Sequence, residues 1–169
     1  MTDNVPSPNA NPVHVWELME KIGFCMLASH DGEEIRSRPM AAYVRPEEGA
    51  VYFLTDADSA KADELAARPQ VNLAFADSSG QTYVSVTGRA VVSNDRGKIE
   101  ELFGTPAKAW WDDPEDPSIR VLEVTPVDAQ YWDSPGTLRS YIRMAAAAVS
   151  DSRPALGENA KVDMESERV

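Results

Sequence analysis

The chain has 169 residues, a formal net charge of −12 at pH 7 and a single cysteine. This length is sufficient for one domain with a sizeable core. The excess of Asp and Glu argues against nucleic acid and anionic membrane surfaces as partners. No apolar run approaches the roughly 18 residues of a membrane helix. Met1–Pro12 also lacks a secretory signal pattern, so we expect a cytoplasmic protein.

The residue types used in metal sites and nucleophilic catalysis are scattered. Cys25 lies in an apolar run, which predicts a buried small side chain rather than a reactive thiol and fits a reducing compartment. His14 and His30 are far apart, and no group of Cys, His, Asp and Glu has metal-ligand spacing. Neither histidine belongs to a recognisable nucleophile–base pattern. We therefore expect neither a metal nor a catalytic triad.

The first half of the chain predicts strands that alternate with short helices. Residues 1–11 are polar and predict a flexible N-terminus, and the apolar spacing over residues 12–22 predicts a helix that Gly23 ends. Pro39 interrupts a predicted strand, which indicates an edge position or a bulge. The strands expected here are Phe24–Ser29, Glu34–Val44 and Val51–Thr55, followed by a helix over Ala60–Arg68.

The second half predicts longer strands. Gly88 indicates a bend or bulge, and Asn94 or Asp95 is expected to cap a helix that runs through Phe103. The expected strands are Gln70–Ala76, Thr82–Ser93 and Ile119–Trp132, with a second short helix over Thr105–Trp111. The segment 135–150 contains an alanine-rich helix, Leu138–Val149, and residues 151–169 predict a flexible polar tail. About six strands with short helices predict a mainly β fold, a small antiparallel β-barrel over residues 12–134 with peripheral helices.

One stretch combines the features of an anion site. The strand before Asp58 leads into a helix whose first residues include Ser59 and Lys61, and backbone N–H groups at a helix start attract anions. Arg38, on the neighbouring strand, could reach the same anion and stays charged. The overall negative charge does not exclude this, because the Debye length is about 8 Å at physiological salt. We therefore expect a bound phosphate that belongs to a flavin nucleotide.

Several segments, taken in order, resemble a known family. Ser37-Arg38-Pro39-Met40, Phe53-Leu54-Thr55 and Ser59-Ala60-Lys61 resemble the flavin-binding split barrels related to pyridoxamine 5′-phosphate oxidase. The segments that indicate the general stress protein 26-like branch are Pro69-Gln70-Val71-Asn72-Leu73, Tyr83-Val84-Ser85-Val86-Thr87-Gly88-Arg89-Ala90 and Ala129-Gln130-Tyr131-Trp132. The resemblance covers about Val15 to Asp133.

The resemblance implies a six-stranded antiparallel split barrel and a homodimer with FMN, or FAD, at the subunit interface. It implies that the phosphate is held by Arg38, Ser59 and Lys61. It implies that the flavin ring and ribityl chain are lined by Pro39, Met40, Leu54 and Thr55. Tyr83 stands where the oxidases carry a glutamine that touches the flavin, so its role stays open. Trp111, rather than Trp110, is the expected cover for the flavin of the partner subunit.

Two departures bear on the activity. Tyr43 stands where the oxidases have a lysine that binds the substrate's phosphate, and the end of this chain has no equivalent of their C-terminal Arg and Trp motif. We therefore do not expect oxidation of pyridoxamine phosphate. We expect an FMN-dependent oxidoreductase whose small-molecule redox partner is unknown. Two alternatives stay open: a flavin-binding stress-response module without turnover, and a split barrel that uses deazaflavin or haem.

Overall fold

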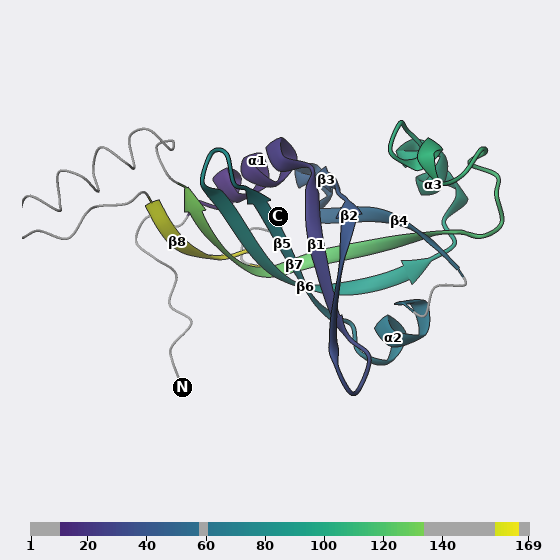
Figure 1. Cartoon of the computed structure of the whole chain (residues 1–169), viewed down its shortest axis with the longest axis horizontal. Coiled ribbons are helices and arrows are strands. Elements are labelled where there is room, and N and C mark those ends of the chain that lie inside the picture. The colour runs from purple at the N-terminus through teal and green to yellow at the C-terminus, as the bar shows by residue number, and fades with distance from the viewer. Residues whose placement is uncertain (1–10, 58–60, 134–157, 166–169) are drawn as a thin grey trace, which may run out of the picture.

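The computed structural model describes residues 11–57, 61–133 and 158–165 (Figure 1). The helices are α1 (Pro12–Ile22), α2 (Lys61–Ala67) and α3 (Arg96–Leu102), and short 3₁₀ turns are η1 (Pro46–Glu48) and η2 (Ala107–Ala109). The strands are β1 (Phe24–His30), β2 (Ile35–Ala41), β3 (Tyr43–Arg45), β4 (Ala50–Asp56), β5 (Gln70–Asp77), β6 (Thr82–Ser93), β7 (Ile119–Asp133) and β8 (Glu158–Asp163). None of these helices has the length and apolar character that crossing a membrane requires.

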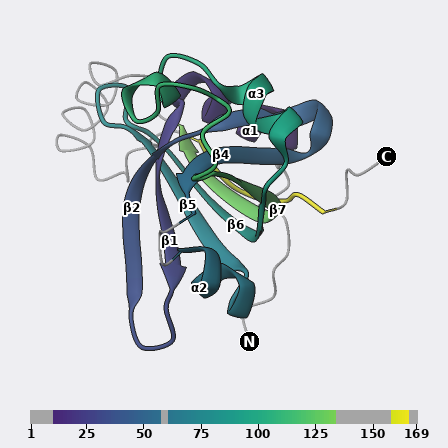
Figure 2. The ribbon, with the colours of Figure 1, turned by 90° about the vertical axis from the view of Figure 1, so that its right-hand side faces the viewer.

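The described strands form one 8-stranded sheet in the order β2-β1-β5-β6-β7-β4-β3, and β8 pairs with β7. Every strand pair is antiparallel. β3 follows β2 after a one-residue break at Ala42, so the two ends of the strand order are consecutive in the chain. The sheet therefore curls into a half-barrel, with the helices at its periphery (Figure 2). This confirms the predicted mainly β, antiparallel split barrel.

The strand count differs from the predicted six at two places. The predicted strand over residues 34–44 is divided at Ala42, because β2 pairs with β1 whereas β3 pairs with β4 on the other side of the barrel. The predicted polar tail contains β8, which differs from the expectation of a flexible segment. Ala160 and Val162 alternate with polar residues and are buried, so these two residues of the strand join the core. The predicted helix over residues 138–149 lies outside the described residues.

The period-two pattern of the strands separates an inner face from an outer face. One row of paired residues runs across five neighbouring strands and is buried: Leu27, Leu73, Val86, Ala129 and Val162. The adjacent row consists of outward-facing residues: Met26, Ala74, Ser85, Gln130 and Lys161. α1 adds Val15, Leu18 and Met19 to the inner cluster. Asn11 caps this helix and Gly23, with φ of 70°, ends it as predicted.

β4 is buried on both faces. Val51 and Phe53 face the inner cluster, whereas Tyr52 and Leu54 belong to a second cluster formed with α3 and the segment after it. The predicted helix over residues 105–111 is reduced to the 3₁₀ turn η2. A strand covered on both faces can position side chains firmly, and its carboxyl end, Thr55–Asp56, lies next to the segment that contains η2.

Two local predictions are confirmed by the sheet. Pro39 lies in β2, an edge strand whose one paired neighbour is β1. The register between β6 and β7 shifts between Thr87 and Gly88, so the predicted irregularity lies at Gly88, although the extra residue of the bulge, Val127, belongs to the partner strand β7. Cys25 is also buried, as predicted, and burial raises the pKa of its thiol to about 12, which makes it inert.

Candidate functional site

A cleft of about 600 Å³ lies between the end of β2, the end of β4 and the segment around η2. Its volume is within the range of about 300–1,000 Å³ that is usual for ligand pockets. The described residues that line it are mostly apolar: Phe24, Arg38, Pro39, Met40, Ala41, Tyr43, Leu54, Thr55, Asp56, Pro106, Ala107, Ala109, Trp110 and Trp111. An aromatic and aliphatic lining with few charges suits a flat heteroaromatic ligand.

Six of the residues predicted from the sequence line this cleft together: Arg38, Pro39, Met40, Leu54, Thr55 and Trp111. They come from three separate elements, and the fold brings them to one place. Tyr83 does not line the cleft, since it lies on β6 opposite Trp132 and faces outward. Lys61 is the first residue of α2, and Ser59 lies outside the described residues.

Sequence reasoning missed several residues of the cleft. Phe24 enters because it pairs with Ala41 at the end of β2, so both residues lie on the same face at the rim. Asp56 simply continues β4 beyond Thr55. Trp110 is 81% exposed although it is a large aromatic residue, and it lines the cleft beside Trp111. The two adjacent tryptophans could have indicated from the sequence that both residues belong to the site. The pairing of Phe24 with Ala41 could not be predicted from the sequence.

Arg38 supplies the positive charge that lines the cleft. Its Nη1 donates a hydrogen bond to Ser29 Oγ at 2.9 Å, and its Nη2 lies 3.6 Å from Glu64 Oε2. Ser29 Oγ in turn donates to the same Glu64 oxygen at 3.5 Å. The guanidinium has five N–H donors, so this arrangement orients it and leaves donors for a ligand. The carboxylate of Glu64 balances the charge of Arg38.

The same contacts place Arg38 beside α2. Glu64 lies within this helix, one turn after its first residue, Lys61. Figure 2 shows α2 next to the β1–β2 hairpin that carries Arg38. The ion pair with Glu64 therefore places Arg38 beside α2, and the convergence of Arg38 with Ser59 and Lys61 on a phosphate stays a prediction.

The wall of the cleft that follows α3 is held in place by an arginine. Arg96 Nη2 donates hydrogen bonds to the carbonyl oxygens of Pro114 and Asp116. This joins the first turn of α3 to the far end of the loop that begins with η2, Trp110 and Trp111. The two tryptophans are therefore part of a segment that is tied to the fold at both ends.

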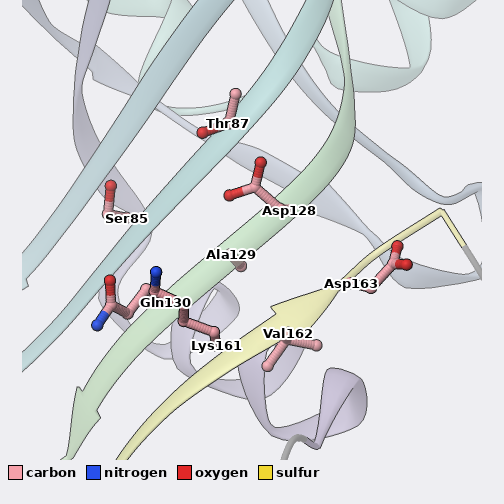
Figure 3. A pocket seen from close by; sticks show the side chains of 8 residues that line it. All are labelled: Ser85, Thr87, Asp128, Ala129, Gln130, Lys161, Val162 and Asp163. Carbon is pink, nitrogen blue, oxygen red and sulfur yellow. The ribbon is translucent and has the colours of Figure 1, made fainter. Parts of the chain in front are cut away.

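A second, smaller hollow lies on the outer face of β6, β7 and β8, with a volume of about 200 Å³ (Figure 3). Figure 3 shows that its side chains are mostly polar and come from three adjacent strands. Ser85 accepts a hydrogen bond from Asn72, and Gln130 donates one to Asn159, so these groups already have protein partners. The hollow is too small for a nucleotide by the usual range of pocket volumes.

No metal site is found among the described residues, since they contain no group of three or more His, Cys, Asp and Glu that could hold an ion. The fold and the larger cleft define a split-barrel protein with a largely apolar cleft at the ends of two strands.

The family model described as "Pyridoxamine 5'-phosphate oxidase like" matches residues 11–155, and the chain belongs to this family. This confirms the resemblance drawn from the sequence. Among proteins of known sequence, the chain is similar to Protein bli-3 of Neurospora crassa, with 28% identity over 144 residues that cover 78% of this chain and 69% of that protein.

Solved structures support the same placement. The chain is similar to a protein of Jannaschia sp. CCS1 provisionally named general stress protein 26, with 27% identity, a TM-score of 0.72 and coverage of 89% of this chain and 95% of that one. It shares its fold with the general stress FMN/FAD binding protein of Xanthomonas citri, with 23% identity, a TM-score of 0.65 and coverage of 73% and 89%. The chain is thus similar to general stress protein 26-like proteins.

Proposed function

We propose that this chain binds FMN in the 600 Å³ cleft and acts as an FMN-dependent oxidoreductase on a small-molecule substrate. The observation that carries the proposal is a guanidinium, Arg38, in the lining of a cleft that is otherwise largely aromatic and aliphatic. The FMN/FAD binding described for the Xanthomonas citri protein supports a flavin as the ligand. The single described cysteine is buried and unpaired, which supports a cytoplasmic location.

The residues of the cleft fit a flavin nucleotide. Trp110 and Trp111 offer aromatic faces for a flat ring, and Pro39, Met40 and Leu54 offer apolar walls. Arg38 offers unused guanidinium donors for the phosphate. FMN is proposed rather than FAD because the described lining has one cationic side chain, enough for a single phosphate.

The protein's own contribution is binding, orientation and exclusion of water, whereas bound FMN would supply the redox chemistry. The titratable side chains in the described lining are Arg38, Tyr43 and Asp56. Arg38 stays charged in proteins, and burial raises the pKa of Tyr43 above its ordinary value. Neither of these two groups readily transfers a proton at neutral pH. Asp56 is then the remaining titratable side chain of the described lining, and a flavin-binding stress-response module without turnover is the second candidate.

We further propose that the protein is a homodimer whose interface adjoins the cleft. Four large apolar side chains on the outer face of the sheet are exposed: Phe24 (60%), Met26 (41%), Tyr83 (41%) and Trp132 (38%). Met26 is paired with Ala74 on β5, and Tyr83 is paired with Trp132, so the face is continuous across β1, β5, β6 and β7. Phe24 also lines the cleft. An apolar face of this kind marks a protein–protein contact, and the polar hollow of Figure 3 would form part of its rim.

The test of the dimer is light scattering at micromolar concentration. We expect a dimer for the natural sequence and a monomer for Met26→Glu, because a buried unpaired carboxylate opposes association. Val91→Glu is the matched control, since Val91 is also exposed (62%) but lies at the other end of β6. A natural chain that scatters as a monomer would contradict the shared interface.

The test of the ligand is titration of the purified protein with FMN, followed by flavin fluorescence and absorbance. The spectrum of any co-purified cofactor distinguishes flavin from deazaflavin and from haem. The test of turnover is anaerobic reduction of the complex by NADH or NADPH, followed by reoxidation with an added acceptor. Repeated cycles would support the oxidoreductase, whereas binding without reduction would support the second candidate. Absence of FMN binding would refute the proposal.

A further inference from the structure

The hydroxyl of Tyr43 has no hydrogen-bond partner although it is buried. Within the described part of the chain, it is the one buried side-chain oxygen or nitrogen in this state. A buried polar group without a partner is costly, and native proteins rarely keep one without a reason. Tyr43 also lines the cleft, so other atoms of the side chain that carries the buried hydroxyl border the proposed binding site.

The neighbouring Tyr52 differs from Tyr43 in that its hydroxyl has a hydrogen-bond partner. Tyr43 on β3 is paired with Tyr52 on β4, so both side chains project to the same face and both contact the second core cluster. The Tyr52 hydroxyl donates to Glu48 Oε2 at 2.7 Å, and Lys98 Nζ lies 4.8 Å from the centre of its ring. The protein thus satisfies one of two adjacent tyrosine hydroxyls and leaves the other unpaired. Of the two residues, Tyr43 lines the cleft and Tyr52 does not.

We propose that the Tyr43 hydroxyl donates a hydrogen bond to an uncharged acceptor of the bound flavin. This inference rests on the proposed function, and it assigns Tyr43 as a specificity residue of the same site. The hydroxyl reaches the ligand when the Tyr43 ring turns from its buried position toward the cleft. The ligand therefore completes a hydrogen bond that the ligand-free protein lacks.

Two features determine which part of the ligand Tyr43 contacts. β2 and β3 are extended, so Tyr43 lies up to about 16 Å along the backbone from Arg38. A phosphate held by Arg38 leaves the ribityl chain or the ring, with their hydroxyl, carbonyl and nitrogen acceptors, for Tyr43. Burial raises the pKa of the Tyr43 hydroxyl above its ordinary value of 10, although the nearby Arg45 opposes this, so the group remains a protonated donor at neutral pH.

The test is the Tyr43→Phe variant, measured with and without ligand. Removal of an unsatisfied hydroxyl should stabilise the ligand-free protein, and we expect its Tm to rise by about 3 °C. The same removal should raise the Kd about fivefold, because one neutral hydrogen bond to the ligand is lost. The loss should be equal for FMN and riboflavin, since the phosphate is not involved. A shift of the absorbance maximum of the bound flavin would assign the contact to the ring, and an unchanged maximum would assign it to the ribityl chain.

Tyr52→Phe is the matched control. It removes the same atom from the adjacent tyrosine, but that hydroxyl is bonded to Glu48 and Tyr52 does not line the cleft. We expect its Tm to fall and its Kd for FMN to stay within about twofold of the natural value. Opposite signs in the two Tm changes would support the assignment of Tyr43.

The outcomes separate this inference from the proposed function. FMN binding with an unchanged Kd in Tyr43→Phe would overturn the role of Tyr43 and leave the flavin site standing. A loss for FMN without one for riboflavin would also overturn it, because Tyr43 would then act through the phosphate. Failure of the natural chain to bind either flavin would overturn both proposals.

Discussion

Replacement of Arg38 by alanine should weaken FMN binding by about 30-fold. Charge-assisted hydrogen bonds are worth about 1.5–3 kcal/mol each, and the guanidinium can offer two of them to a phosphate. Part of this gain is offset, because Arg38 already lies 3.6 Å from Glu64 and is 23% exposed, so solvent and the existing ion pair compete. A net value of about 2 kcal/mol corresponds to the 30-fold change in Kd.

The assay compares FMN with riboflavin, which lacks the phosphate. Arg38→Ala should raise the Kd for FMN and leave that for riboflavin within about twofold, because only the phosphate contact is lost. The binding of FMN to the natural chain should also weaken with added salt, and this dependence should be smaller in the variant. Arg38→Lys should give an intermediate loss, since it keeps the charge but not the planar fork.

Arg36→Ala is the matched control. Arg36 lies on the same strand, is 56% exposed, and pairs with Asp31 at 2.9 Å and Glu34 at 3.0 Å rather than lining the cleft. Its replacement should leave both affinities unchanged. Equal losses for FMN and riboflavin in Arg38→Ala would refute the phosphate assignment. Because Arg38→Ala leaves Glu64 unpaired, the double variant Arg38→Ala with Glu64→Gln separates lost binding from lost stability.

Three further predictions concern stability. Gly88→Ala should lower the Tm by about 3–6 °C, because the added Cβ would lie 2.6 Å from a side chain and 2.9 Å from a backbone oxygen of β7. An unchanged Tm would contradict the close packing at this position. Lys98→Met should lower the Tm by a few degrees, since Lys98 Nζ lies 3.0 Å from Glu48 and 2.7 Å from Glu101, and thermal denaturation tests this. Hydrogen bonds hold the pKa of Glu48 (from Tyr52, then Lys98) and of Glu101 (from Lys98) below the ordinary 4.5. Their stabilising contribution should therefore be complete above pH 4.5 and be lost as the pH falls below it, and a Tm that stays constant down to pH 3 would argue against this.

The elements of the fold could be predicted well because their signals are local. The apolar spacing of α1 and its stop at Gly23, whose φ is 70°, depend on residues within a few positions of each other. The bounds of β6, Thr82–Ser93, follow from alternation along one strand, and the structure has the same bounds. The division of the strand at Ala42 was missed, because it depends on β3 pairing with β4 rather than on any turn residue.

The candidate site could be predicted only in part, because some of its residues lie in recognisable short segments and others reach the cleft through strand pairing. The resemblance predicted that Arg38, Leu54 and Thr55 lie together, and they do line one cleft. Phe24 could not be predicted, since it reaches the cleft through its pairing with Ala41. The strand β8 was also missed. Its polar–apolar alternation is too short to predict a strand by itself, and the strand forms by pairing with β7.

The sequence by itself determined most of the secondary structure and the family, because these depend on local periodicity and on short ordered segments, and it singled out Arg38, which lines the cleft. Only the tertiary structure decided which residues share the cleft and which hydroxyl stays unpaired. Tyr43 and Tyr52 are indistinguishable as residue types, and it is the position of Glu48 beside one of them that sets them apart. Glu48 precedes Tyr52 by only four residues, whereas the position of Tyr43 in the cleft depends on β2, β4 and the segment around η2 meeting in space, which no local pattern records.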